Sequence, residues 1–214
     1  MARMRDCCEI RADVPERQRR VLRIVLWINA AMFLAELGAG VLAHSTSLIA
    51  DSADMLGDTI VYGFSLYVVG RGAAWRARGA LLKGIVMAAF GLGVLADVAR
   101  KLAGGLVPSA GLMGTVGLVA LAANLFCLIL LARRRADDLN MRSAWVCSRN
   151  DVTANVGVLL AAMAVALTGS AWPDILMGLL LATLFGVSAV SVIRAARREL
   201  AAPPPPALLS TPGV

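Results

Sequence analysis

Two pairs of potential metal ligands stand four residues apart inside otherwise apolar segments. Asp54 and Asp58 form the first pair, and Cys147 and Asp151 form the second. Residues four apart on a helix lie one above the other on the same face. Two carboxylates that close together repel each other unless a cation or a proton lies between them. If the two helices pack side by side, the four side chains can form one tetrahedral metal site.

Acidic side chains within a segment apolar enough to span a membrane are energetically costly, and they usually mark an ion or proton pathway. A metal ion would neutralise most of their charge and offset the cost of burying it. The alternative reading of Asp54 and Asp58 is a structural hydrogen-bonded pair, or two acids that face a water-filled cleft. Cys147 taken alone would be a packing residue, but its register with Asp151 favours a ligand.

Four further residues are candidates for auxiliary metal contacts. Asp51 shares the helical face of the first pair but lies nearer the outer surface, so an exit-path ligand and a structural residue are both open readings. His44 is expected at the outer membrane edge, as a weak exit ligand or as a solvated interface histidine. Cys7 and Cys8 are either a soft-metal capture element on the N-terminal tail or two free thiols.

Three carboxylates and one thiolate make a mixed hard and soft ligand set. Carboxylates alone suit manganese or magnesium, whereas a thiolate favours softer ions. The set predicts Zn²⁺ or Cd²⁺ first, with Co²⁺ and Pb²⁺ as further options. Because the ligands must lose protons to bind metal, loading displaces protons and protonation releases the ion. This chemistry predicts metal/proton antiport.

The composition places these pairs in a membrane. The chain has 214 residues, of which 59% are hydrophobic and 16% charged, and its mean hydropathy is +0.75. The hydrophobic share and the hydropathy exceed those of soluble domains, and the charged share is lower. Six apolar runs are each long enough to cross about 30 Å of hydrocarbon at about 1.5 Å per residue. They cover residues 21–43, 48–70, 79–99, 110–132, 144–169 and 173–193. The expected fold is an all-α membrane protein with six transmembrane helices.

The basic residues predict the orientation of these helices. Most of the 21 Lys and Arg residues lie in the N-terminal tail, after the second run (Lys83 among them), after the fourth run, or near the C-terminus. Arg100 and Lys101 are expected in a loop on the outer side. The positive-inside rule therefore predicts that both termini are cytoplasmic. The predicted organisation is a cytoplasmic tail at residues 1–20, a six-helix transmembrane domain at 21–196 and a Pro-rich cytoplasmic tail at 197–214. This signal accounts for the net charge of +7, and no nucleic-acid-binding pattern is present.

Several motifs resemble those of the cation diffusion facilitator family. Residues 50–58 read ADSADMLGD, which is similar to the ADxxHMxxD motif of that family's second helix with Asp54 in place of His. Cys147 and Asp151 stand where the family's fifth helix carries HxxxD. The resemblance covers about residues 25–200 and includes other typical residues: Asn29, Glu36, Asn124, Leu139–Arg142 and Asp174. It implies a proton-coupled exporter of zinc and related divalent metals, with Asp54, Asp58, Cys147 and Asp151 as ligands.

The chain is expected to be a variant without the soluble C-terminal domain that many family members carry, and a homodimer stays open. The expected setting is the inner membrane of a bacterium, in metal transport and heavy-metal resistance, with lipid, metal ion and protons as partners and no cofactor. Two alternatives stay open as well: a membrane-bound metal sensor or accessory subunit of a resistance system, and an exporter of organic cations. The few aromatic residues near the acids disfavour the latter. No enzyme motif is present.

Overall fold

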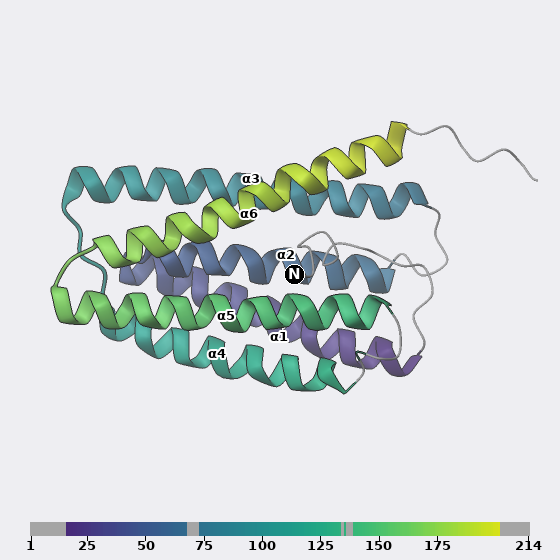
Figure 1. Cartoon of the computed structure of the whole chain (residues 1–214), viewed down its shortest axis with the longest axis horizontal. Coiled ribbons are helices and arrows are strands. Elements are labelled where there is room, and N and C mark those ends of the chain that lie inside the picture. Colours follow the sequence, from purple (N-terminus) through teal and green to yellow (C-terminus); the bar gives the residue numbers. More distant parts are fainter. Residues whose placement is uncertain (1–15, 68–72, 134, 136–138, 202–214) are drawn as a thin grey trace, which may run out of the picture.

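The computed structural model describes residues 16–67, 73–133, 135 and 139–201, and it is built from helices alone over this part of the chain (Figure 1). The six-helix prediction is confirmed. The helices are α1 (Glu16–Ala43), α2 (Thr46–Tyr67), α3 (Ala73–Gly104), α4 (Ala110–Ala132), α5 (Leu139–Thr168) and α6 (Trp172–Ala201).

Five of these helices, all except α2, are long and apolar enough to cross a membrane. α2 departs in composition, because its 22 residues include three aspartates. At 1.5 Å per residue it is still about 33 Å long, which suffices to span the hydrocarbon. Its acids are tolerated because α2 is surrounded by other helices and contacts α1, α3, α5 and α6. The chain is thus a multi-pass membrane protein.

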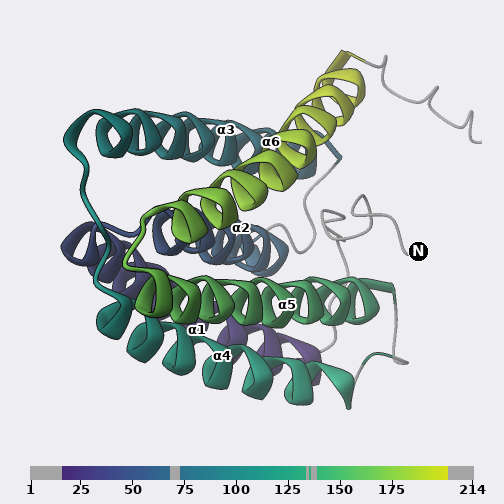
Figure 2. The same cartoon turned by 60° about the vertical axis from the view of Figure 1, so that its left-hand side comes forward.

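The helices pack in pairs around α2. α3 packs mainly against α6, α4 against α5, and α1 against α2. The α3–α6 pair lies on one side of α2, and α1, α4 and α5 lie on the other (Figures 1 and 2). α1 begins and α6 ends at the same end of the bundle, called here the terminal end (Figure 1). The opposite end holds the α1–α2, α3–α4 and α5–α6 connections and is called the turn end.

The helices continue past the apolar runs into charged sequence. α1 begins at Glu16, inside the segment predicted as an N-terminal tail, and α6 continues to Ala201, inside the predicted C-terminal tail. Arg and Glu are good helix formers, so hydropathy locates the hydrocarbon-spanning part of a helix better than its ends. Each connection at the turn end includes a residue of positive φ: His44 (53°), Gly105 (62°) and Gly169 (63°). Such left-handed residues commonly end helices.

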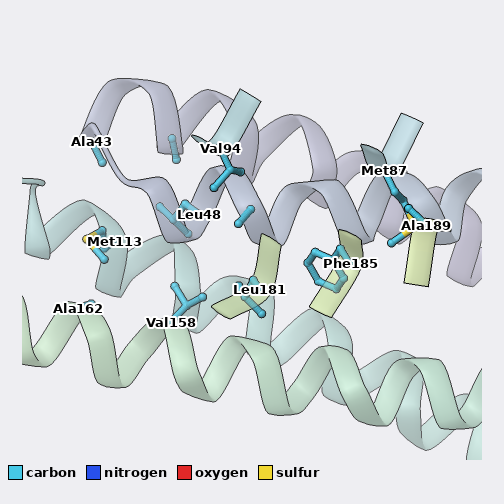
Figure 3. Packing of buried hydrophobic residues seen from close by; sticks show 12 residues of the cluster. Ala43, Leu48, Met87, Val94, Met113, Val158, Ala162, Leu181, Phe185 and Ala189 are labelled. Atoms are coloured by element: carbon cyan, nitrogen blue, oxygen red, sulfur yellow. The ribbon is translucent and has the colours of Figure 1, made fainter. Parts of the chain in front are cut away.

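Close helix packing surrounds α2 and α3. The largest apolar cluster joins residues of all six helices and includes Leu48, Val94 and Phe185 (Figure 3). A Cβ atom on Gly178 would lie 2.7 Å from Cγ2 of Thr46, and one on Gly84 would lie 2.6 Å from Cγ1 of Ile193. Both distances are too short for a side chain, so these glycines let the backbones of α2, α3 and α6 approach closely, as small residues do between membrane helices.

Candidate metal site

α2 and α5 contact each other and bring both predicted ligand pairs to one region of the bundle. The two helices run in opposite directions (Figure 1). Because α5 runs toward the turn end, Cys147 lies one turn nearer the terminal end than Asp151 does. The carboxyl groups of Asp54 and Asp151 face each other closely enough to interact. Asp58, Cys147 and Asp151 are all buried.

Asp58 has two partners that were not predicted as site residues. The Tyr62 hydroxyl donates a hydrogen bond of 2.9 Å to Oδ2 of Asp58. The Lys83 ammonium lies 3.5 Å from Oδ1 of the same carboxylate. Tyr62 also interacts electrostatically with Cys147 and Asp151. Tyr62 continues the four-residue register of the first pair, a signal that could have identified it.

Lys83 is not a loop residue, contrary to the prediction. It was counted among the basic residues of the loop after the second apolar run, yet it lies within α3 and is only 3% exposed. A basic residue inside the apolar run at 79–99 was the available signal for a buried partner of an acid.

The four predicted ligands do not form a complete metal site as they stand. Among the described residues, no three Asp, Glu, His or Cys side chains are grouped closely enough to hold an ion. Instead, Asp54 is paired with Asp151, and Asp58 with Tyr62 and Lys83. An incoming ion would have to replace these internal partners, so the four-ligand site stays a prediction.

Asp51 is buried and tied to two other helices. Nδ2 of Asn155 donates a 2.7 Å hydrogen bond to Oδ2 of Asp51, and Nδ2 of Asn124 donates one of 3.1 Å to Oδ1 of Asn155. These bonds link α2, α5 and α4, which fits the structural reading of Asp51. Glu36 of α1 interacts electrostatically with Asp51 and Asp54, and neither of its carboxyl oxygens has a hydrogen-bond partner within the described part of the chain.

The remaining predicted candidates lie elsewhere. His44 is exposed in the α1–α2 connection at the turn end. Cys7 and Cys8 fall outside the described residues. Cys127 is buried in an apolar cluster with Leu22 and Val25, as expected of a packing residue.

A second group of buried polar residues, called here the turn-end cluster, fastens α2 to α3 and α6. It comprises Ser45, Thr46, Ser47, Asp97, Lys101 and Asp174. The Asp174 carboxylate accepts hydrogen bonds from the backbone N–H groups of Thr46 (2.8 Å) and Ser47 (3.0 Å) and pairs with Lys101. It thereby caps the first turn of α2, where N–H groups lack helical partners.

The other members complete this cluster. The hydroxyls of Ser45 and Ser47 donate to Asp174 at 2.7 and 2.6 Å, and the hydroxyl of Thr46 donates to Asp97 at 2.7 Å. Lys101, read from the sequence as an outer loop charge, is fully buried here.

Comparisons with known proteins identify the family of this chain. Residues 22–201 match the family described as the cation efflux transmembrane domain. The chain is 30% identical over 175 residues to the metal cation efflux system protein CzcD of Cupriavidus metallidurans and to the cation efflux system protein CzcD of Alcaligenes sp.. The matched part is 76% of this chain and 55% of each relative, so the chain spans about half the length of these relatives. The chain belongs to the cation diffusion facilitator family.

Proposed function

We propose that this chain exports a divalent metal cation across the inner membrane in exchange for protons, with Zn²⁺ or Cd²⁺ as the preferred ion. The observation that carries the proposal is that α2 and α5 contact each other where Asp54 and Asp151 interact. Each of these residues belongs to a predicted ligand pair whose two members stand four residues apart in the sequence. The names of the two relatives, both cation efflux proteins, support the same activity.

The proposed exchange follows from the chemistry of the ligands. Carboxyl and thiol groups bind metal in their deprotonated forms, so the ion and the protons compete for the same atoms. A proton on any of the four predicted ligands is one that an ion would displace. Metal loads from the cytoplasm, the helices around the site move as rigid units, and protons from the other side release the ion.

Transport in proteoliposomes tests the proposal. The full chain is reconstituted in vesicles that contain a metal-sensitive dye or a pH-sensitive dye, and Zn²⁺, Cd²⁺, Co²⁺, Pb²⁺ and Mg²⁺ are added in turn. The expected result is Zn²⁺ or Cd²⁺ flux with proton movement in the opposite direction, and little Mg²⁺ flux. Metal binding without flux would instead favour a sensor or accessory subunit. Flux of a cationic dye in place of metal would favour an exporter of organic cations.

Cys147→His is expected to move the preference from Cd²⁺ toward Zn²⁺. Imidazole is a harder ligand than thiolate, so the ratio of Cd²⁺ to Zn²⁺ affinity should fall by about tenfold, or ~1.4 kcal/mol. Competition between the two ions in the proteoliposome assay measures the ratio. Cys127→Ala is the matched control, because it alters a buried cysteine among apolar residues. An unchanged ratio in Cys147→His would show that this residue does not touch the ion.

A further inference from the structure

Lys83 is a buried cation held against a predicted metal ligand. Its side chain and that of Asp58 are each only 4% exposed, and Nζ lies 3.5 Å from Oδ1. A lysine inside a membrane segment is costly unless it is paired, and its pairing usually has a function. Here the ammonium occupies one of the oxygens that the proposed metal site needs.

The local packing provides space for this side chain. A Cβ atom on Gly57 would lie 3.1 Å from Cε of Lys83 and 3.6 Å from Sδ of Met87. The alkyl chain of Lys83 therefore lies directly over the α2 backbone, at the residue that precedes Asp58. On the other side of α3, a Cβ atom on Gly84 would lie 3.3 Å from the carbonyl oxygen of Ala189, so α3 is pressed against α6 next to Lys83. Lys83 thus reaches from the α3–α6 pair to the ligand face of α2.

A divalent ion and this ammonium cannot both bind Asp58 closely. Two positive charges a few ångströms apart in a poorly solvated interior repel each other strongly. The carboxylate, in turn, cannot be left buried without a positive partner at low cost. One cation must therefore leave Asp58 when the other arrives.

We infer that Lys83 is a tethered counter-cation of the metal site. Its ammonium pairs with Asp58 in the unloaded site, is displaced by the incoming ion, and returns when the ion leaves. This inference rests on the proposed function. Displacing the ammonium costs free energy, so it lowers the affinity of the site for every divalent ion. Only ions that bind the ligands strongly are therefore retained, and the release of a bound ion becomes easier. Lys83 is in this sense a residue that sets affinity without being a ligand.

Metal binding by Lys83 variants tests the inference. Lys83→Met removes the charge and keeps an unbranched apolar chain, and Lys83→Gln keeps a hydrogen-bond donor if the first variant folds poorly. Cd²⁺ binding to the purified full chain in detergent is measured by competition with a chromogenic chelator. Both variants are expected to bind Cd²⁺ at least about tenfold more tightly than the wild type. The metal-induced rise in melting temperature should also be larger in both variants than in the wild type.

Arg149→Met is the matched control for the loss of one positive charge. Arg149 lies two residues from Cys147 but is exposed and stacks on Trp145 at 5.5 Å, so its removal should change Cd²⁺ affinity by less than twofold. Unchanged or weaker Cd²⁺ binding in the Lys83 variants would overturn the inference, as would an equal gain in Arg149→Met. If the wild type binds no metal at all, the proposed function itself fails. If the wild type binds Cd²⁺ and the Lys83 variants bind it with the same affinity, only the inference that Lys83 is a counter-cation is rejected.

Discussion

Asp151→Ala is expected to abolish metal-driven proton movement in proteoliposomes while the protein still inserts. The substitution removes a predicted ligand and leaves Asp54 without its neighbouring carboxyl group. Loss of an outer-shell partner alone typically lowers metal affinity 10- to 100-fold, so loss of a direct ligand should lower it by more than about 100-fold. Direct titration with Cd²⁺ or Zn²⁺ measures the affinity, and dye-reported flux measures transport.

Two comparisons make this result specific to the carboxylate. Asp151→Asn preserves the volume of the side chain and should be nearly as defective, because an amide is a poorer ligand than a carboxylate. Thr153→Ala alters the same helix two residues away, where the hydroxyl bonds to the Arg149 carbonyl on an exposed face, and it should transport normally. Normal transport by Asp151→Ala would rule out the four-ligand site.

Asp174→Ala is expected to destabilise the protein by about 3–5 kcal/mol, the usual cost of breaking a buried ion pair by removing one partner. The fully buried Lys101 ammonium would keep only the longer contact of 3.8 Å with Asp97, and the first N–H groups of α2 would lose their cap. Thermal unfolding in detergent, followed by circular dichroism, measures the loss. Metal affinity need not change in molecules that still fold.

Arg100→Ala serves as the comparison for Asp174→Ala. Arg100 pairs with Asp97 at 2.7 Å in the same region, but its side chain is 55% exposed. Exposed pairs contribute about 0–1 kcal/mol, so this variant should unfold nearly as the wild type does. If the two variants have equal stability, the turn-end cluster does not hold α2, α3 and α6 together.

The sequence was informative where the signal is local. Six long apolar segments predicted six helices, and the four-residue spacing of Asp54 and Asp58 placed both on one face of α2. Helix ends were less accurate, since Glu16 and its basic neighbours extend α1 without adding hydropathy. Periodicity and spacing reflect contacts within one helix, which a single sequence contains.

The features that were missed depend on contacts between distant segments. Lys83 was read as a loop charge, because nothing local shows that α3 lies against Gly57 of α2. Asp174 was noted as typical of the family, but its bonds to Thr46 and Lys101 join three helices. One sequence gives no indication of which distant helix faces a given residue, so such partners emerge only from the packed bundle.

Displacement of Lys83 from Asp58 would leave the turn-end cluster as a pivot between α2 and the α3–α6 pair. α3 and α6 are joined to α2 there through Asp174 and Lys101, whereas nearer the terminal end the ion pair that links α3 to α2 is that of Lys83 with Asp58. Spin labels on α2 and α3 should therefore report distances that widen with Cd²⁺ at the terminal end and stay fixed at the turn end; equal changes at both ends would exclude a pivot. Displacement of the single Lys83 ammonium would then move the terminal ends of α3 and α6 together, relative to α2.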